Sequence, residues 1–185
     1  MPKLAVLVSG QGTLLKPIVD AETPVGLVLA DRKCPGLYWA QEAKIPTELV
    51  ERKDFTDGFD HAEHTAQVLG TLLRHRITHV AMAGYKTLLS EALFSHYAGK
   101  ILNTHPSLLP AFKGNHAVRD TLAYGAKITG CTVHIATAEM DAGPILAQEH
   151  VRVEDGDTEE TLHARIKAVE SWLYPLIIRQ QLKRA

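Results

Sequence analysis

The sequence is short of cysteine, of any excess charge and of long apolar runs, and each shortage argues against a class of protein. Its two cysteines, Cys34 and Cys131, are too few for a disulfide framework or a zinc site. A formal net charge of −1 argues against a nucleic-acid-binding surface, which normally shows a basic excess. No stretch approaches the roughly 20 apolar residues of a membrane helix. The start of the chain shows no signal-peptide pattern, so we expect a cytoplasmic protein without nucleic-acid or membrane partners.

What the sequence does contain is an alternation of short apolar runs with segments of helical periodicity. Its 185 residues, 45% of them hydrophobic, suffice for one sizeable core, and we expect a single domain over residues 1–185. The expected strands are 4–8, 25–29, 47–50, 79–83, 100–102 extended towards His105, 127–136 and 145–153. The expected helices are 14–21, 37–43, 61–75, 90–97, 116–124 and one from about Thr158. This order predicts an α/β fold with a mostly parallel twisted sheet flanked by helices.

Several local details refine this prediction. The tight connection at residues 139–144 predicts an antiparallel edge at the C-terminal end of the sheet. Asp157 with Glu160 is expected to form a capping box for the last helix, and Pro175 to kink or split that helix. The histidines of the 61–75 helix are expected to be solvated; they are His61, His64 and His75.

Asn103 and His105 are the strongest candidates for chemistry. If the strand stays extended, residues two apart point to the same side of it, and Pro106 ends the strand just beyond them. Both would then lie at the carboxyl end of a strand, where open α/β sheets place their active sites. An amide that holds an oxyanion beside an imidazole that titrates near neutral pH suits acyl-type transfer. The alternative is that Asn103 caps a turn and His105 is one of ten ordinary histidines.

A second candidate is the loop Ser9-Gly10-Gln11-Gly12-Thr13, between the first strand and the first helix. Free backbone N–H groups at a helix start bind anions, and glycine allows a phosphate to approach closely. The glycine spacing fits neither a P-loop nor a dinucleotide site, so a monophosphate is the more modest inference. A tight turn without a ligand is the alternative.

Taken together, three motifs identify a family resemblance. In chain order they are Ser9-Gly-Gln-Gly-Thr, Asn103-Thr-His-Pro-Ser-Leu-Leu-Pro and Met140-Asp-Ala-Gly-Pro-Ile. The chain resembles the glycinamide ribonucleotide formyltransferases of purine biosynthesis over nearly its whole length. The resemblance implies a Rossmann-like fold and formyl transfer from 10-formyltetrahydrofolate, a co-substrate, to the amine of N1-(5-phosphoribosyl)glycinamide. It implies no metal, and it leaves a homodimer open.

The resemblance also implies roles for particular residues. Asn103 would stabilise the tetrahedral oxyanion, His105 would act in proton transfer, and Asp141 would orient His105 and favour its protonated form. Asp141 could otherwise be only a turn residue. Thr132 and His134 would support the site, although His134 could equally be a strand histidine whose ring is satisfied by its neighbours.

Substrate-binding residues follow from the same resemblance. The phosphoribosylglycinamide would contact Gly12, Thr13, Leu14, Lys167 and Glu170. The folate would contact Lys86, Thr87, Leu88, Leu89, Asn103, Thr137, Ala138, Glu139, Met140 and Asp141. Many members have Ser-Asn where this chain has Thr13-Leu14, and we hypothesise that Lys167 supplies the lost phosphate contact. The usual Met-Arg of the folate loop is Lys86-Thr87 here, so the basic residues that meet the folate tail are not identified.

Other functions with related chemistry remain as alternatives. A methionyl-tRNA formyltransferase is expected to carry a further C-terminal domain, and a formyltetrahydrofolate deformylase an N-terminal regulatory domain. A sugar-nucleotide formyltransferase fits the loop at Ser9–Thr13 and Glu170 less well. From a different class, the chain could be a non-catalytic module that binds a phosphorylated ligand. Such a module would not need Asn103, His105 and Asp141 together.

Overall fold

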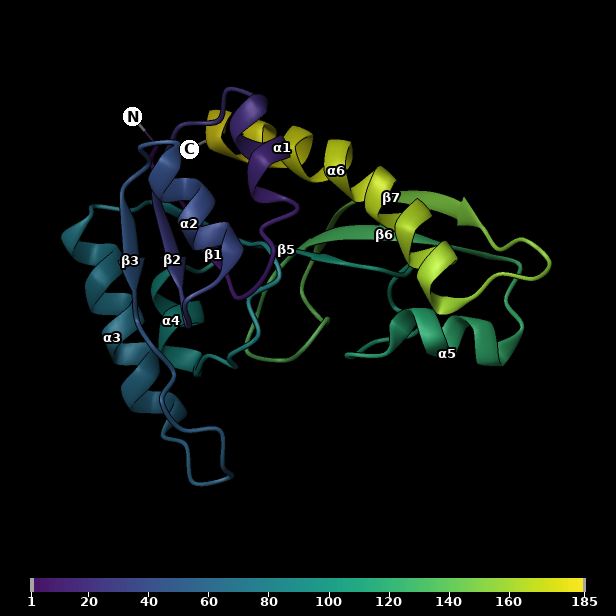
Figure 1. The fold of residues 1–185 in the computed structure, drawn as a ribbon, viewed down its shortest axis with the longest axis horizontal. Helices are drawn as coiled ribbons and strands as arrows, with labels where there is room; N and C mark the ends of the chain where they lie inside the picture. The colour runs from purple at the N-terminus through teal and green to yellow at the C-terminus, as the bar shows by residue number, and fades with distance from the viewer. Residues whose placement is uncertain (1, 185) are drawn as a thin grey trace.

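The fold is built on one seven-stranded sheet (Figure 1), in a computed structural model that describes residues 2–184. The strands are β1 (Leu4–Val8), β2 (Val25–Ala30), β3 (Thr47–Leu49), β4 (His79–Met82), β5 (Ile101–His105), β6 (Ile128–Ile135) and β7 (Ile145–Arg152). The helices are α1 (Leu15–Asp20), α2 (Pro35–Glu42), α3 (His61–Arg74), α4 (Glu91–His96), α5 (Ala117–Tyr124) and α6 (Glu159–Lys183). Every strand and helix expected from the sequence is present, with bounds that differ by a few residues at most.

The strand order is β3-β2-β1-β4-β5-β6-β7. Strands β1 to β5 pair in parallel, whereas β6 pairs antiparallel with both β5 and β7. The predicted mostly parallel sheet with an antiparallel C-terminal edge is therefore confirmed. From β1 the chain first moves outward to β2 and β3 and then returns to β4 on the other side of β1. Loops that follow such neighbouring strands meet at one edge, where open α/β sheets bind ligands.

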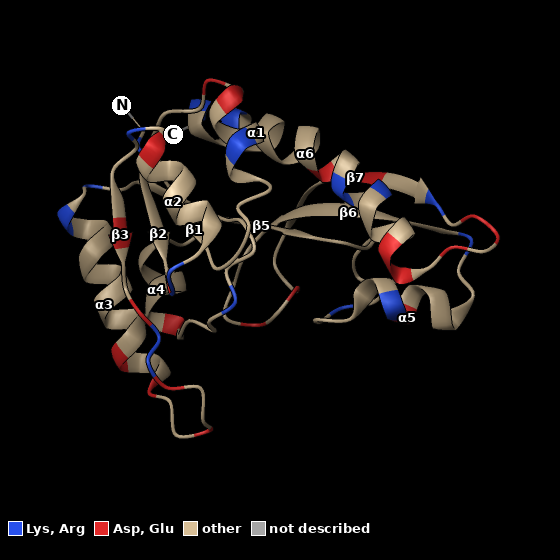
Figure 2. Cartoon of the chain, in the orientation of Figure 1, with Lys and Arg blue, Asp and Glu red and all other residues tan. Residues whose placement is uncertain are grey.

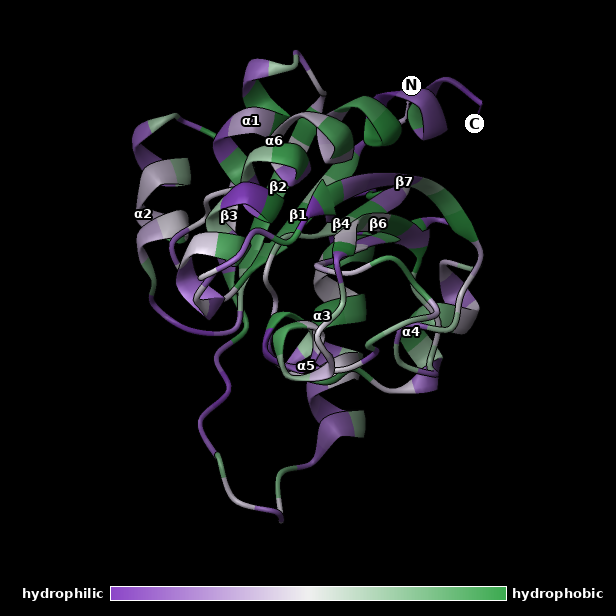
Figure 3. Ribbon diagram, turned by 90° about the vertical axis from the view of Figure 1, so that its right-hand side faces the viewer, coloured by the Kyte–Doolittle hydropathy of each residue, from purple (hydrophilic) through white to green (hydrophobic). Residues whose placement is uncertain are grey.

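Apolar side chains cover both faces of the sheet because strand residues alternate between faces. On β1, Leu4, Val6 and Val8 join the core formed with α1, α2, α5 and α6. Ala5 and Leu7 of the same strand join the second core, formed with α3 and α4. Strands β1 and β2 carry no charged residue, whereas Lys, Arg, Asp and Glu are interspersed over helices and loops (Figure 2). Figure 3 shows the same division, with apolar strands inside and a polar loop that projects between β3 and α3.

The last helix departs from the sequence prediction in two ways. α6 runs without interruption from Glu159 to Lys183 with Pro175 inside it, so the predicted split is wrong. Pro175 and its neighbour Tyr174 are buried, and this packing offsets the hydrogen bond that proline cannot donate. The predicted Asp157–Glu160 capping box is also wrong, because the structure uses Thr158 with Thr161.

Cys131 is fully buried. Another expectation concerns the histidines of α3. The prediction of solvated histidines is wrong for His64, which is only 4% exposed and whose Nε2 lies 3.0 Å from the hydroxyl of Tyr85. The expectation overlooked that α3 packs this side of its surface against the loop after β4. None of the helices formed by residues 2–184 combines the length and apolarity that crossing a membrane requires.

Candidate active site

Asn103 and His105 lie at the carboxyl end of strand β5, just before the chain leaves the sheet. Their strand partners on β6 are His134 and Thr132, respectively, so all four side chains belong to one face at this end of the two strands. The structure thus brings together the two residues of the motif and both residues that were expected to support them.

His105 is held through both ring nitrogens. Its Nε2 lies 2.8 Å from the carbonyl oxygen of Phe112, and its Nδ1 lies 3.3 Å from Oδ2 of Asp141. The side chains of His105 and Asp141 are 6% and 7% exposed. Each ring nitrogen of His105 therefore faces a hydrogen-bond acceptor, so the ring is fixed in one orientation.

Asp141 connects two loops that meet over the strand end. It belongs to the connection between β6 and β7, and its Oδ2 accepts a hydrogen bond from the backbone N–H of Gly114, at 2.9 Å, in the loop after β5. Its Oδ1 lies 3.7 Å from Nε2 of His134. Asp141 therefore fixes the position of a loop as well as that of His105, which is more than a turn residue would do.

His134 orients the amide of Asn103. Burial lowers the pKa of His134, although the Ile135 carbonyl and the Asp141 carboxylate oppose this effect. The neutral ring donates from Nδ1 to the carbonyl oxygen of Ile135 at 3.0 Å, which leaves Nε2 as an acceptor for the Asn103 amide at 3.3 Å. One N–H of the Asn103 amide is engaged in this way, and its second N–H remains for a ligand.

Thr132 holds the loop that follows His105. Its hydroxyl donates to the carbonyl oxygen of Ser107 at 2.6 Å and accepts from the backbone N–H of Leu109 at 3.0 Å. The amide of Gln148 donates to the same hydroxyl and to the Leu109 carbonyl, both at 2.9 Å. Gln148 was missed in the sequence, since only the strand register, which pairs it with Thr132, reveals its position.

Glu170 approaches β5 from the opposite face. Its Oε1 accepts a hydrogen bond from the hydroxyl of Thr104 at 2.9 Å, and Thr104 points away from Asn103 and His105 because it lies between them on the strand. Burial raises the pKa of Glu170, while Thr104 and Lys167 act against this rise. Lys167 is exposed one turn earlier on α6. Thr104 was missed in the sequence, although its place between the two candidates could have indicated it.

The glycine loop after β1 is shaped by contact with α2. Gly12 has φ +69°, and a Cβ added to it would lie 2.7 Å from the Cα of Gly36. The N–H of Gly36 donates to the carbonyl oxygen of Gly10 at 3.0 Å. Thr13 is exposed, whereas Leu14 is 7% exposed and belongs to the core, so only the backbone of Leu14 can meet a ligand.

The predicted folate-binding residues lie in two loops at the same edge. Lys86 and Leu88 are exposed, whereas Thr87 is buried and donates its hydroxyl to Oδ2 of Asp31 at 2.6 Å. Leu89 packs against the second core. In the loop after β6, the predicted residues are mostly exposed; they are Thr137, Ala138, Glu139 and Met140. Asp31, which the sequence did not single out, is therefore attached to one of these loops.

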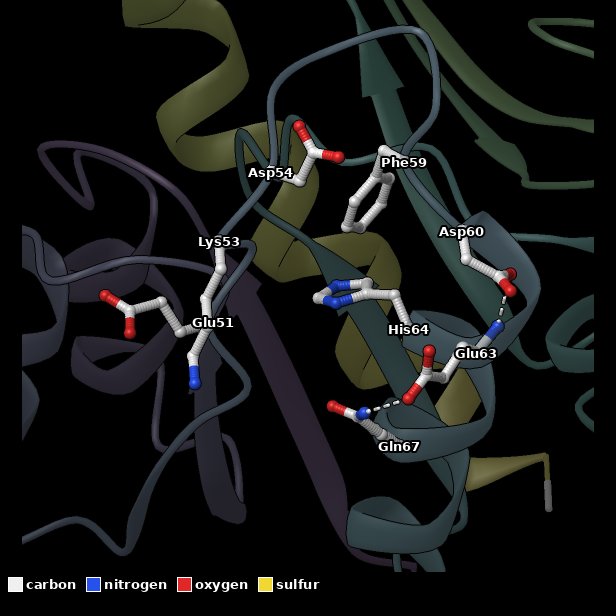
Figure 4. A pocket seen from close by; sticks show the side chains of 8 residues that line it. All are labelled: Glu51, Lys53, Asp54, Phe59, Asp60, Glu63, His64 and Gln67. Carbon is white, nitrogen blue, oxygen red and sulfur yellow. Dashed lines mark hydrogen bonds between the residues drawn. The ribbon is translucent and has the colours of Figure 1, made fainter.

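A separate cavity of about 410 Å³ lies between the projecting loop and α3 (Figure 4). Its lining residues are Glu51, Lys53, Asp54, Phe59, Asp60, Glu63, His64 and Gln67. Four of these are carboxylates, and Asn103, His105 and Asp141 are not among them. The cavity is thus distinct from the arrangement around His105. Among residues 2–184, no group of three or more His, Cys, Asp or Glu side chains is arranged to hold a metal ion.

Comparison with known proteins gives a consistent result. Residues 2–178 match the family described as formyl transferase. A phosphoribosylglycinamide formyltransferase from Mycobacterium tuberculosis is 44% identical over 175 residues, which cover 91% of this chain and 79% of that protein. The crystal structure of glycinamide ribonucleotide transformylase 1 from Symbiobacterium toebii superimposes with a TM-score of 0.90 at 37% identity, covering 99% of this chain and 88% of the other.

The same architecture also occurs in a protein named for another reaction. A formyltetrahydrofolate deformylase from Pseudomonas syringae pv. tomato superimposes with a TM-score of 0.88 at 26% identity. The match covers all of this chain and 62% of the deformylase chain. The fold alone therefore does not select the formyl acceptor.

Proposed function

The chain belongs to the formyl transferase family, and we infer that it transfers a formyl group from 10-formyltetrahydrofolate to the amine of phosphoribosylglycinamide, a step of purine biosynthesis. The observation that carries this inference is the arrangement around His105. Its ring is held between the Asp141 carboxylate and a backbone carbonyl, two residues from an amide with a free N–H. We assign the chemistry to Asn103, His105 and Asp141 within a single domain.

The reaction explains why these three groups are needed together. The amine nitrogen of the acceptor attacks the formyl carbon, and the carbonyl oxygen becomes an oxyanion that the Asn103 amide stabilises. In enzymes generally, losing one such donor raises the barrier by about 3–4 kcal/mol. The C–N bond to N10 of the folate then breaks, and the proton lost by the attacking amine is delivered to N10. His105 serves this proton transfer, and Asp141 holds its ring in place.

The acceptor is proposed to bind between the glycine loop and α6. The backbone of Gly12, Thr13 and Leu14 would donate to the phosphate, and the exposed ammonium of Lys167 would add a positive charge. Glu170, already placed by Thr104, would accept from the amine or from ribose hydroxyls. Leu14 contributes only its backbone because its side chain is buried.

The folate is proposed to lie against residues 86–89 and 137–141, next to Asn103. Thr87 would take part through its backbone, since its hydroxyl is engaged by Asp31. The chemistry needs no metal, because amide, imidazole and carboxylate groups provide the charge stabilisation and the proton transfer. A cytoplasmic location, the absence of a nucleic-acid partner and a homodimer stay predictions.

Sequence identity favours this acceptor over the alternatives. The relative named for the glycinamide reaction is 44% identical, whereas the structural neighbour named as a deformylase is 26% identical. A module that only binds a phosphorylated ligand has no use for a histidine clamped by a carboxylate. Formyl transfer to a sugar nucleotide would use the same catalytic chemistry, so only an assay distinguishes that acceptor from phosphoribosylglycinamide.

The test is formyl transfer from 10-formyltetrahydrofolate, followed by the absorbance of the released tetrahydrofolate, with and without phosphoribosylglycinamide. We expect turnover that requires the ribonucleotide and that falls by about 10²–10⁴ in His105→Ala, the usual contribution of a general acid–base residue. His150→Ala is a matched control, because His150 lies on β7 with a side chain that is 73% exposed. Folate consumption without the ribonucleotide would identify a deformylase, and no turnover with either would leave only ligand binding.

A further inference from the structure

We propose that Asp31 is a positioning residue that holds the loop at residues 9–14 and the loop at residues 86–89 in one fixed relation. This inference rests on the proposed function, which assigns the first loop to the phosphorylated acceptor and the second to the folate. Asp31 touches neither substrate in this proposal. It acts through the loops that do.

The carboxylate of Asp31 is buried yet fully engaged. Asp31 follows β2 directly, and its side chain is 0% exposed. Oδ2 accepts from the Thr87 hydroxyl at 2.6 Å and from Nη2 of Arg32 at 3.0 Å, while Oδ1 accepts from Nε of Arg32, also at 3.0 Å. The guanidinium therefore binds both oxygens, and Thr87 adds a third donor.

Ser9 extends this network to the glycine loop. Its hydroxyl accepts from the backbone N–H of Lys86 at 2.8 Å and lies near enough to the Asp31 carboxylate to help lower the pKa of that group. Ser9 is 7% exposed and begins the loop that follows β1. Ser9, the first residue of one substrate loop, is thus bonded to Lys86 of the other loop, and Asp31 is bonded to the adjacent Thr87.

The strand order places Asp31 close to both loops. β2, β1 and β4 are neighbours in the sheet, and Asp31, Ser9 and Lys86 lie in the segments that follow them. The side chain of Asp31 reaches across the end of β1 to the loop after β4, 56 residues away in the chain. The backbone carbonyl of Asp31 also accepts from the N–H of Arg52 at 2.7 Å, which fixes the start of the projecting loop.

The carboxylate is held in its charged form. Burial by itself raises the pKa of Asp31, but the hydrogen bonds from Arg32 and Thr87, together with the nearby Ser9 hydroxyl, outweigh burial and leave the pKa below its ordinary value. A buried ion pair is a poor source of stability, since well-packed apolar residues often serve at least as well. A charged carboxylate with several hydrogen bonds instead fixes the positions of the groups that donate to it.

Thr87→Val tests the link to the folate loop, because it keeps the side-chain shape and removes only the hydroxyl. We expect the KM for 10-formyltetrahydrofolate to rise about tenfold, the loss typical of one hydrogen bond to a charged group, with kcat within about threefold. Thr87→Ser restores the hydroxyl and is expected to restore the KM. Asp31→Asn removes the charge that fixes Thr87, next to the Lys86 that Ser9 binds, and is expected to raise the KM of both substrates.

Glu48→Gln is a matched control, since Glu48 lies on the neighbouring strand β3 and pairs with His75 at 2.8 Å, away from both loops. It should leave both KM values unchanged. A merely structural role for Asp31 would lower thermal stability in Thr87→Val and Asp31→Asn and leave both KM values at the wild-type level, and that result overturns the proposal. If Asp31→Asn does not fold, the Thr87→Val and Thr87→Ser pair decides.

Failure of this inference can be told apart from failure of the proposed function. Wild-type turnover with phosphoribosylglycinamide, measured first, tests the function. Isothermal titration of wild type and Thr87→Val with tetrahydrofolate measures the folate Kd without any turnover. A tenfold weaker Kd in Thr87→Val supports the role of Asp31 even if the acceptor is another compound, and equal Kd values in the two proteins contradict it.

Discussion

His105 receives both of its hydrogen-bonding neighbours from residues in an uncommon backbone conformation. Phe112 and Asp141 each have φ +53°, in the left-handed region that residues other than glycine seldom adopt. Phe112 supplies the carbonyl oxygen that faces Nε2 of His105, and Asp141 supplies the carboxylate that faces Nδ1. Such conformations cost of order 1–3 kcal/mol each and persist where the surroundings over-determine them, often at active sites. Here the two strained residues together fix the orientation of the His105 ring.

Asp141→Asn tests the role of the carboxylate without disturbing the turn. Asparagine tolerates left-handed backbone as well as aspartate does, so we expect the fold and the thermal midpoint to be retained. The amide lacks the negative charge of the carboxylate that faces Nδ1 of His105, and kcat should fall by roughly 10²–10⁴. Steady-state kinetics beside a thermal melt measure both quantities. Asp155→Asn, at a side chain 99% exposed, is the control, and a kcat within twofold of wild type in Asp141→Asn would remove Asp141 from the mechanism.

Lys167→Ala tests whether α6 supplies a charge to the acceptor phosphate. A contact made equally in the ground and transition states affects KM alone, so the KM for phosphoribosylglycinamide should rise about tenfold at unchanged kcat. The KM for the folate should not move. Lys127→Ala, at a side chain 80% exposed whose ammonium lies 3.4 Å from Asp155, controls for the general loss of a positive charge. An unchanged KM for the acceptor would show that the backbone of the glycine loop suffices.

At this scale the sequence indicated some of the site and not the rest. The period of two along a strand predicted that Asn103 and His105 share a face, and the register with His134 and Thr132 agrees. Asp141 was found only through family resemblance. The carbonyl of Phe112, the amide of Gln148 and the carboxylate of Asp31 were not predicted, because each contact depends on how distant loops fold over the strand ends.

Helix α6 depends on charged contacts at its start. Asp157 precedes the capping residue Thr158, and its Oδ1 accepts from Nη1 of Arg165 at 2.8 Å. The bond from Arg165, with further donors from Glu154 and Thr161, holds the pKa of Asp157 well below its ordinary value of 3.8. The ionised carboxylate therefore has more favourable interactions in the folded state than in the unfolded state, and its ionisation increases the free energy of unfolding.

The pH dependence of Asp157→Asn follows with a definite sign. Because the folded pKa is depressed, the stabilisation is complete above the ordinary value and is lost as the pH falls below about 4. We expect the urea midpoint of Asp157→Asn to lie below that of wild type at pH 7, and the difference to shrink as the pH is lowered towards 3. Asp155→Asn, two residues away and exposed, should show no such difference at either pH. A constant difference across the range would mean that packing, and not charge, explains the contribution of Asp157.

Secondary structure was the most predictable level. Apolar runs such as Leu4–Val8 indicated strands buried on both faces, and the helix expected at residues 61–75 is present and is capped by Asp60 through the N–H of Glu63. The errors occurred where tertiary contacts override local preference. Pro175 lies within α6, where it is buried by tertiary packing. The helix is capped by Thr158 and not by Asp157, whose carboxylate binds Arg165.

On the scale of the whole molecule, the candidate site lies where the sheet changes from parallel to antiparallel pairing. β4 and β5 pair only at Val80 with Ile101 and at Ala81 with Leu102, after which the two strands separate. β5 stays paired with its antiparallel partner β6 up to His105, whereas Met82 of β4 has no partner on β5. Helix α6 closes the gap with Tyr174, which is fully buried and whose hydroxyl lies 3.0 Å from the Met82 carbonyl oxygen and 2.8 Å from that of Leu102.

Tyr174→Phe tests whether α6 holds these strands in register for catalysis. The ring remains, but the two carbonyl groups lose the single hydroxyl proton that they share, and an unsatisfied buried group costs about 1–3 kcal/mol. We expect the free energy of unfolding from urea titration to fall by about that amount. Because Met82 leads towards residues 86–89, which are proposed to bind the folate, and Leu102 precedes Asn103, kcat should also fall severalfold. Tyr38→Phe, at a side chain 50% exposed, should change neither quantity. Lost stability with unchanged kcat would mean that the antiparallel pairing of β5 with β6 positions the catalytic residues without help from α6.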